Sequence, residues 1–529
     1  MIRIIRVICE IRGLKASDAN ATKWIASPPF AWLRTTCYPA TALVPGLIAA
    51  QILATLQVYL SNAGLYHALT VINDAGYLAI PNQQVANRLH GFGPAFFGGL
   101  FFTLSVGGGI SILAFAAAWI WNRLFYRKKL LLPLLWLPWI GSLAEVNSRG
   151  FCPMVSSYFL VIPVVVFWVS LRWMPPQTRK PVWLTGLVQL IPIILLVLLW
   201  LPQMGNRLFL DVRDNLLLSN TLGTKINDFY YRYTLYPAEV FKSLDQKMLK
   251  TCSLEHIRNG PARRLLERKL LDHDYLRVRG DLEVDLELGI REVGNTLVFE
   301  NRGRPVLRTS QNDFLSRPDN TLRKFSLKSD RHAFFRGFVF FSILIGFPVT
   351  LYLFLYALFR SVLHIFLGLR IASIGASILC FLAGISFLIP LHPNKGGKIT
   401  PADLTHDLKS GSWQERVAAL KIICETGGEV ADFDGYQRMV TSPHIPERYW
   451  SAKALGVSRK PETYRDILSC LNDGHPNVVS MAFYALGQRG DARAVQRIIR
   501  EINKSGDWYN QWYAYKAMRA LGWKQTRLK

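Results

Sequence analysis

Runs of about 20 consecutive apolar residues recur along the sequence, and they constrain the fold more than any other feature. A helix of about 20 residues matches the hydrocarbon thickness of a bilayer, so each run predicts a membrane-spanning helix. The composition agrees, because 50% of the 529 residues are hydrophobic and 19% are charged, a balance too apolar for a soluble protein of this length. Six runs are clear and cover residues 38–60, 95–121, 154–173, 183–201, 337–358 and 365–391.

A seventh apolar run, residues 130–144, is shorter than the others and lies between Lys129 and Glu145. It either crosses a thinned bilayer or forms a re-entrant hairpin. Ionisable residues are nearly absent inside the spans, whereas an ion-coupled transporter normally carries carboxylates or histidines at mid-membrane. The sequence therefore predicts a mainly α-helical bundle of about seven spans and disfavours secondary transport.

Lysine and arginine are distributed unequally between the segments that join the spans. The N-terminal 36 residues carry six, residues 122–129 carry four and residues 172–180 carry three, whereas 61–93 contains only Arg88 and 147–150 only Arg149. Because basic residues collect on the cytoplasmic side, the N-terminus is expected in the cytoplasm, with the chain crossing a bacterial-type inner (plasma) membrane. With seven crossings, the chain between the fifth and sixth spans and the chain after the last span both lie outside the cytoplasm.

The net charge of +26 raises the question of nucleic-acid binding, but the basic residues recur in short clusters beside apolar runs and do not form one tract. This distribution predicts contact with anionic lipids at the cytoplasmic face and no nucleic-acid partner. The N-terminal residues form either a basic amphipathic segment on the inner membrane surface or a structural stub. The expected divisions are 1–36 as the basic segment, 37–204 as spans one to five, 205–336 as an inserted α+β soluble domain, 337–391 as spans six and seven, and 392–529 as a helical-repeat domain.

The inserted domain contains a stretch in which apolar and acidic residues alternate, from Asp281 to Ile290. A period of two predicts a strand with one buried face, and turns at 293–295 and 301–304 then fold the chain into a three-stranded meander. The acidic face is either a site for calcium or a basic partner, or a solvated face balanced by neighbouring arginines. The apolar positions are Leu282, Val284, Leu286, Leu288 and Ile290, and the acidic ones are Asp281, Glu283, Asp285 and Glu287.

Earlier in this domain, six aromatic residues crowd between residues 229 and 241 in a helical rhythm. Aromatic residues with polar tips suit a boundary between lipid and water. The sequence therefore predicts either a helix on the membrane surface or a core for the domain. His273, between Asp272 and Asp274, has no nucleophile or metal-ligand spacing beside it and is expected in a surface turn.

An Ala-Leu pair recurs four times in the C-terminal region, with its leucines 35, 31 and 35 residues apart. This period is typical of stacked helical hairpins. The small alanine lets neighbouring helices approach closely, and the glycine that follows three of the pairs favours a left-handed cap. The pairs are Ala419-Leu420, Ala454-Leu455, Ala485-Leu486 and Ala520-Leu521.

Residues 475–502 show the pattern most fully. A helix ends in Ala-Leu-Gly, a Gly490-Asp491 turn follows, and a helix that contains Ala494-Val495 packs back. This stretch resembles the HEAT-like repeats of the phycobilisome-lyase type. The resemblance extends over about the last 120 residues and implies an α-solenoid that presents a binding surface and carries no chemistry of its own.

The last predicted helix of this region is rich in aromatic residues and is the candidate site for a partner protein. Its other interpretation is a terminal cap that packs on the preceding repeat. The candidate partner-binding residues are Trp508, Tyr509, Trp512, Tyr513 and Tyr515.

No catalytic, cofactor-binding or metal-binding pattern accompanies these features, and the seven cysteines lack the spacing of a zinc or haem site. We therefore expect a non-catalytic membrane subunit or scaffold, whose extracytoplasmic repeats dock another membrane or extracytoplasmic protein. The alternative is a membrane-embedded enzyme or permease acting on a lipid or lipid-linked substrate, with polar groups supplied by residues 61–93. Those groups are His67, Asp74, Arg88 and His90.

Overall fold

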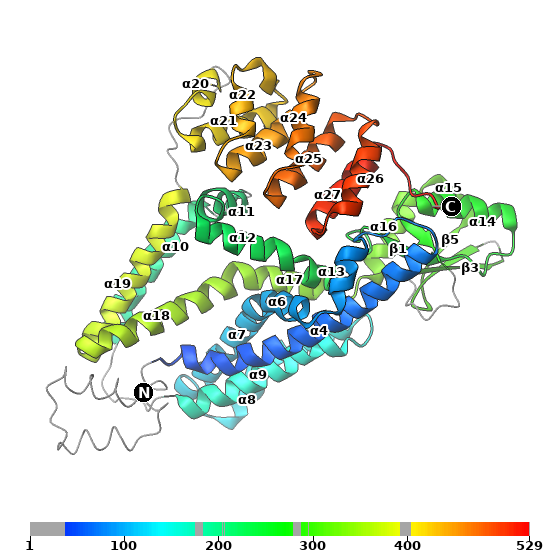
Figure 1. The fold of residues 1–529 in the computed structure, drawn as a ribbon. Helices are drawn as coiled ribbons and strands as arrows, with labels where there is room; N and C mark the ends of the chain where they lie inside the picture. Colours follow the sequence, from blue (N-terminus) through cyan, green and yellow to red (C-terminus); the bar gives the residue numbers. More distant parts are fainter. Residues whose placement is uncertain are drawn as a thin grey trace. The chain divides into compact units, whose positions relative to one another are not determined.

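The computed structural model describes residues 37–174, 183–203, 205, 207–278, 287–294, 296–391 and 404–527. The chain is mainly helical, with one small mixed sheet and a helical-repeat array near its C-terminal end, as the sequence predicts (Figure 1). It divides into two compact units. The first is built from Met1–Ala54, Gly99–Leu208 and Phe334–Pro390, and the second from Thr55–Gly98, Phe209–Ala333 and Leu391–Lys529.

The first unit consists of long apolar helices, three of which continue into the second unit. They are α4 (Ala40–Asp74), α6 (Phe92–Phe102), α7 (Gly108–Arg123), α8 (Leu132–Asn147), α9 (Pro153–Trp173), α10 (Trp183–Trp200), α17 (Ala333–Phe341), α18 (Phe347–Phe366) and α19 (Leu369–Leu388). Within this unit α7 packs against α9, and α19 packs against both α10 and α18. Single π-helical turns, η2 (Thr103–Gly107) and η6 (Ser342–Gly346), join α6 to α7 and α17 to α18.

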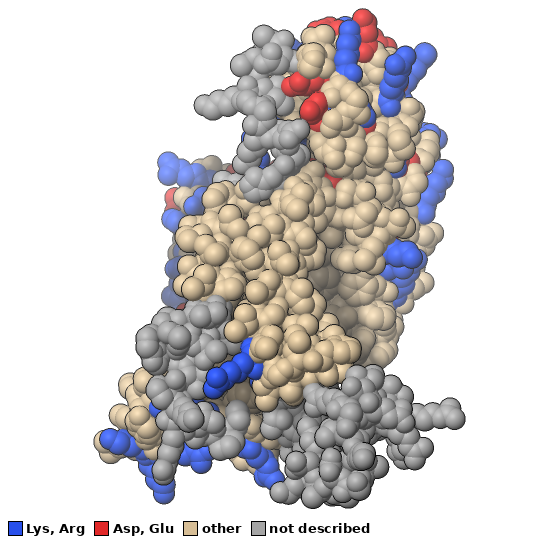
Figure 2. Space-filling model, turned by 90° about the vertical axis from the view of Figure 1, so that its left-hand side faces the viewer, with Lys and Arg blue, Asp and Glu red and all other residues tan. Residues whose placement is uncertain are grey.

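Among the described residues, six helical stretches are long and apolar enough to cross a membrane. The number rises to seven if Ile191–Gln203 and Leu208–Leu217, whose axes differ by 103°, count as one span. The short run at 130–144 belongs to one continuous helical stretch, Lys129–Asn147, and does not form a hairpin. The face drawn in Figure 2 shows a broad expanse of uncharged side chains. By length and composition, the helices of the expected bundle are therefore present.

Glycines of the first unit lie where its helices cross most closely. A Cβ atom on Gly346 of η6 would stand 2.8 Å from the Cα atom of Gly109 on α7, and one on Gly384 of α19 would stand 2.5 Å from a methyl group of Leu196 on α10. A side chain at Gly346 would meet the backbone of α7, so only glycine permits that crossing, whereas a side chain at Gly384 would require Leu196 to move. These two glycines therefore serve packing within the unit.

The second unit contains a five-stranded mixed sheet in the order β2-β1-β3-β4-β5. The antiparallel strands β3, β4 and β5 form the meander that the sequence predicts, whereas the parallel strands β1 and β2 were not expected from any pattern. Helices α14 (Gly260–Leu271) and α16 (Pro318–Ser329) contribute to the core beside the sheet. The strands are β1 (Lys250–Ser253), β2 (Tyr275–Arg277), β3 (Leu288–Val293), β4 (Thr296–Asn301) and β5 (Arg304–Ser310).

The alternating stretch is only partly described by the structure. Leu288 and Ile290 are buried on one face of β3, as predicted, and Glu287 forms an ion pair with Lys247 and accepts a hydrogen bond from the backbone of Thr251. The other predicted positions of this stretch, residues 281–286, lie outside the described residues. Glu287 therefore serves the fold of the domain by holding the segment before β1.

The repeat array also belongs to the second unit. Its long helices are α21 (Trp413–Thr426), α23 (Ile445–Leu455), α25 (Pro476–Arg489) and α27 (Trp508–Ala520), and each packs against the next. The second helices of the repeats, α22 (Tyr436–Val440), α24 (Thr463–Cys470) and α26 (Ala494–Lys504), alternate with them along the chain. Stacked hairpins of this kind share one continuous core between neighbouring repeats.

Packing within the array corrects the period read from the sequence. Arg416 and Arg448 make the same contacts in consecutive repeats, since each donates to a serine carbonyl six residues earlier and to an acidic side chain of the next repeat. Counted from this pair, the fully buried residues at equivalent places are Ile423, Leu455, Leu486 and Met518, which are 32, 31 and 32 residues apart.

The two outer Ala-Leu pairs therefore lie one helical turn away from the repeat position. Ala419 and Leu420 are buried about one turn before the core residue Ile423. At the other end, Leu521 follows the core residue Met518 by about one turn, and Ala520 is exposed. Residues three or four apart share a helix face, so an Ala-Leu pair one turn away mimics the true repeat in the sequence.

The glycine after the Ala-Leu pair has a different role from the one predicted. Gly456 has a right-handed φ of −67°, and Gly487 lies inside α25, whose left-handed cap is Gly490 with φ +79°. A Cβ atom on Gly456 or Gly487 would stand 2.8 or 2.9 Å from the Cα atom of Ala485 or Ala517 in the next long helix. These glycines thus permit close stacking of the repeats, and only Gly522, with φ +81°, takes the left-handed conformation.

Gly487→Ala should loosen the array, because its new methyl group has no space against Ala517. We expect the free energy of opening of α25 and α27 to fall by about 1–3 kcal/mol, the usual cost of overpacking. Hydrogen exchange of residues 476–520 in the full chain measures this change. Gly474→Ala is the control, because nothing lies within 4 Å of its new methyl group, and equal exchange in the two variants would contradict the stacking role.

Candidate functional site

The predicted partner-binding residues lie on α27, and three of them contact other parts of the same chain. The Tyr515 hydroxyl donates to Oδ1 of Asp274, 2.5 Å away, at the turn before β2. The Tyr509 hydroxyl lies 3.0 Å from Oγ1 of Thr234. The Trp508 ring packs edge-on against the ring of Tyr236, with centroids 5.2 Å apart.

The other two candidates, Trp512 and Tyr513, contact each other with ring centroids 5.0 Å apart, and Nζ of Lys516 stands 3.5 Å from the centre of the Trp512 ring. Trp512 is partly exposed. The aromatic helix is therefore in part an internal contact surface, which neither interpretation of the sequence included. That any of the five residues binds a partner protein stays a prediction.

We call residues 209–241 the covering segment, because they lie along the array. They comprise most of α11 (Leu208–Val212), the π-helical turn η5 (Arg213–Leu217), α12 (Thr221–Tyr233) and α13 (Leu235–Phe241). This segment meets successive repeats in order along the chain. The aromatic group predicted for a membrane surface or a domain core supplies several of these contacts, including that of the Tyr231 ring with Tyr509, at 4.7 Å between centroids.

Asp214 anchors the covering segment to the first repeats. Its side chain is fully buried, and one carboxylate oxygen accepts two hydrogen bonds from Arg213. The other accepts a hydrogen bond of 2.8 Å from Nε1 of Trp450 and lies 3.0 Å from Nζ of Lys421. A buried carboxylate is tolerated only with such full pairing, so this contact fixes both the position of η5 and that of α23.

A second polar contact joins α12 to the third repeat. Nε2 of His475 lies 3.3 Å from Oδ1 of Asp228. Burial lowers the pKa of His475, although the nearby carboxylates of Asp228 and Asp473 favour the protonated ring. Asn227 and Asn477, which are both buried, lie close to this pair in the sequence. The contact between α12 and α25 is therefore polar, whereas the contact between α12 and α27 is aromatic.

Residues 77–90, which we call the capping loop, close the C-terminal end of the array. Ile80 is part of the core of the repeats. The side-chain amide of Asn82 donates to the carbonyl of Ile502 at 2.8 Å, and its backbone N–H donates to Oε1 of Gln511, also at 2.8 Å. Gln525, fully buried, pairs with both backbone groups of Leu78.

Gln511 explains why the loop fits at this place. It donates to the carbonyl of Ser505 at 2.6 Å, as Arg416 and Arg448 do to their own serines. Where those arginines reach an acidic residue of the next repeat, Gln511 accepts the backbone N–H of Asn82. The capping loop thus takes the place of a further repeat, which is how solenoids protect their ends from solvent.

The turn around His273 is also a contact. The backbone carbonyl of Asp272 accepts a hydrogen bond of 2.6 Å from Arg519, and its carboxylate lies 2.7 Å from Nζ of Lys524. His273 is indeed in a turn and is partly buried. Its flanking carboxylates hold the end of the array against the sheet.

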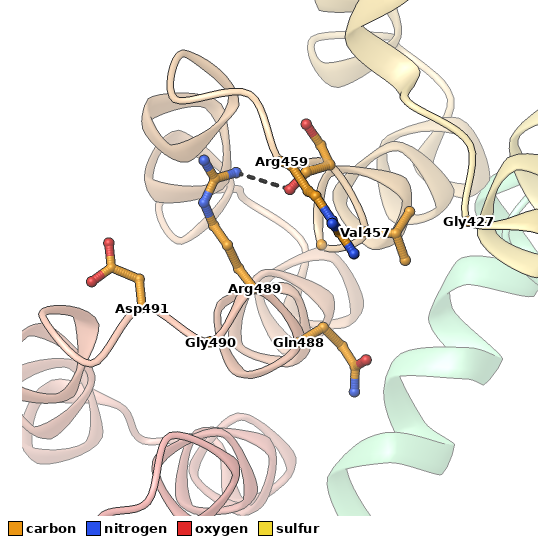
Figure 3. A pocket seen from close by; sticks show the side chains of 9 residues that line it. Gly427, Val457, Arg459, Gln488, Arg489, Gly490 and Asp491 are labelled. Atoms are coloured by element: carbon orange, nitrogen blue, oxygen red, sulfur yellow. Dashed lines mark hydrogen bonds between the residues drawn. The ribbon is translucent and has the colours of Figure 1, made fainter.

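A polar groove of about 660 Å³ opens among the turns of consecutive repeats, lined by residues of the turns at Gly427, 456–459 and 488–491 (Figure 3). Arg489 crosses it and donates to the carbonyls of Ser458 and Lys460 and to Oγ1 of Thr463. Its guanidinium therefore joins two repeats. Arg459, by contrast, is exposed at the groove.

Two of the four polar residues named for the enzyme alternative make contacts within the second unit. Arg88 donates to the carbonyl of Gly506, in the cap of the array, and the His90 ring packs against Tyr66. No group of three or more His, Cys, Asp or Glu side chains in the described part of the chain is arranged to hold a metal ion. The covering segment and the capping loop were missed because the sequence gives no signal for contacts between residues more than 200 positions apart.

Asp214→Asn should release the covering segment, because it leaves the buried Arg213 and the partly buried Lys421 beside a neutral amide. Loss of one member of a buried charge group costs about 3–5 kcal/mol. Hydrogen exchange of residues 221–233 should accelerate accordingly. Asp211→Asn is the matched control, because this more exposed carboxylate is 3.3 Å from the same lysine and such a surface pair contributes about 0–1 kcal/mol. Equal effects of the two variants would contradict the anchoring role.

Comparison with protein-family models agrees with the geometry of the array. Residues 436–521 match the family model of HEAT repeats. Neither the curated proteins nor the solved structures include a match to this chain. The C-terminal region is therefore an array of HEAT repeats, covered and capped by two earlier segments of its own chain.

Proposed function

We propose that this chain is a non-catalytic membrane-anchored scaffold, whose HEAT repeats dock a partner protein on the extracytoplasmic side. The proposal rests on which segments of the chain make up the second unit. This unit combines HEAT repeats, which generally act as binding surfaces, with two segments that stand between long apolar helices in the sequence. Each of the three chain segments in this unit adjoins a candidate span in the sequence.

The contacts of the array also support seven crossings. The capping loop and the covering segment both touch the repeats, so all three must be on one side of the membrane. An even number of crossings must then separate them. Four candidate helical stretches lie between the loop and the segment, namely α6–α7, α8, α9 and α10, and two lie between the segment and the repeats, namely α17–α18 and α19.

This parity requires the short helix α8 and helix α10 either both to cross or both not to cross, and with seven crossings both do. Helix α10, with 18 residues, then crosses without α11, because Asp211 and Asp214 contact the repeats. Eighteen apolar residues fall within the usual range for a transmembrane helix. Together with the distribution of Lys and Arg, the parity supports a location of the repeats away from the cytoplasm.

The surface open to a partner protein is the part of the array that the chain does not itself cover. It includes Trp512 on α27, the exposed Arg459 at the groove, and the outer face of α26, where Arg500 and Lys504 are exposed. Aromatic residues and arginine are the side chains that most often dominate protein interfaces. The partner is expected to be another membrane or extracytoplasmic protein.

A reporter active only in the cytoplasm, fused after Lys529, should be silent in cells, because the array lies on the far side of the membrane. The same reporter fused to a chain truncated after Lys128 should be active, because that point follows the second crossing. Strong activity of the full-length fusion would show an even number of crossings and refute the parity.

Copurification with a tag on the full chain tests the scaffold role. Trp512→Ala should reduce the amount of copurified partner without altering hydrogen exchange of the array. Leu486→Ala should do both, because truncation of a fully buried leucine costs about 2–5 kcal/mol. The scaffold role is refuted if neither substitution changes the set of copurified proteins.

A further inference from the structure

Helix α12 has two different faces. Gly223 and Asn227 are buried, on the side that carries Tyr231 and Thr234 toward the repeats. Three large side chains on another side are open to solvent: Leu222 is 70% exposed, Ile226 51% and Tyr230 47%. Spaced by four residues, they form one row along the helix, and we call these three residues the exposed row.

The neighbours of the exposed row indicate what covers it. Phe229 and Tyr233, which share its side of the helix, pack against Phe97 of α6 with ring centroids 5.7 and 5.0 Å apart. Just beyond α12, a Cβ atom on Gly98 would stand 3.1 Å from Pro237 of α13. The apolar side of α12 therefore continues directly onto the beginning of a candidate span.

Phe97 lies near the start of the candidate span. The candidate span begins at Phe92, so Phe97 is five residues into it. At about 1.5 Å per residue, Phe97 lies roughly 8 Å along the helix from its start. A helix packed at that level lies about where the headgroups of a bilayer meet its acyl chains.

Charged residues border the exposed row. Lys225 and Arg232 are both exposed on α12. Apolar residues on one side of a helix, with basic residues beside them, are typical of helices that lie in the membrane interface and contact anionic headgroups. Asp228, the acidic residue of this helix, points instead to His475 of the repeats.

We propose that α12 is an interfacial helix, with the exposed row immersed at the boundary between headgroups and acyl chains and with Lys225 and Arg232 contacting anionic headgroups. This inference rests on the proposed membrane anchoring. The helix is then bound on one side by lipid and on another by the HEAT repeats, so it links the array to the bilayer surface independently of the spans.

The experiment uses the full chain in vesicles of mixed zwitterionic and anionic lipids, with brominated acyl chains as fluorescence quenchers. An environment-sensitive fluorescent amino acid is incorporated at position 226 by amber suppression. Matched chains carry it at position 195, on the exposed side of α10, or at position 496, on the exposed side of α26. All three native side chains are exposed, so the label is tolerated without repacking.

Labels at 226 and 195 should both be quenched and blue-shifted, and the label at 496 should be neither. Quenching at 195 without quenching at 226 would overturn the interfacial helix while leaving the membrane anchor intact. No quenching at 195 would overturn the anchor itself, and with it this inference. Equal quenching at 226 and 496 would also overturn the inference, because it would show that the array contacts lipid without selectivity.

The basic residues give a second readout. In chains labelled at 226, the combined variant Lys225→Glu and Arg232→Glu should make quenching weaker in vesicles that contain anionic lipid, and should change it little in zwitterionic vesicles. The variant Thr224→Glu is the control, because Thr224 is on the same helix but away from the exposed row. Equal loss in both lipid mixtures would overturn the assignment of headgroup contacts to Lys225 and Arg232.

Discussion

The buried carboxylate of Asp214 determines how the second unit is assembled. A charge without solvent is stable only if every oxygen is paired, and here the pairing groups come from different places: Arg213 from the same turn, and Lys421 and Trp450 from the first two repeats. The array can satisfy this carboxylate only when the covering segment lies along it. The contacts of Asp228 with His475 and of Tyr231 with Tyr509 then follow the same path toward the last repeat.

The open end of the array imposes the second constraint. The last hairpin of a stack has an apolar face that no further repeat covers. It also has polar groups that a further repeat would pair. The capping loop covers the apolar face with Ile80, which enters the core, and it pairs the side chain of Gln511 with the backbone of Asn82. Because this loop stands between α4 and α6 in the sequence, the array contacts distant segments of its own chain at both of its ends.

The sequence predicted those parts of the fold that are encoded by local periodicity. The alternation ending at Ile290 predicted the meander, and the repeated Ala-Leu pairs predicted the HEAT repeats. The true register was hidden because Ala520-Leu521 occurs one turn beyond the core residue Met518, and only packing separates the two. The pairing of Asp214 with Trp450, 236 residues apart, and of Asn82 with Gln511, 429 residues apart, leaves no local pattern at all.

Contacts, and not the connecting chain alone, hold the repeats to the covering segment and the capping loop. A protease site inserted between Gly396 and Gly397 allows the repeats to be cut from the purified full-length protein in its native state. The buried carboxylate and the capping loop predict that the released C-terminal fragment stays bound through size-exclusion chromatography and dissociates when Asp214→Asn is introduced. If Asp214 is unchanged and the C-terminal fragment still separates from the N-terminal fragment as soon as the chain is cleaved, the account is contradicted.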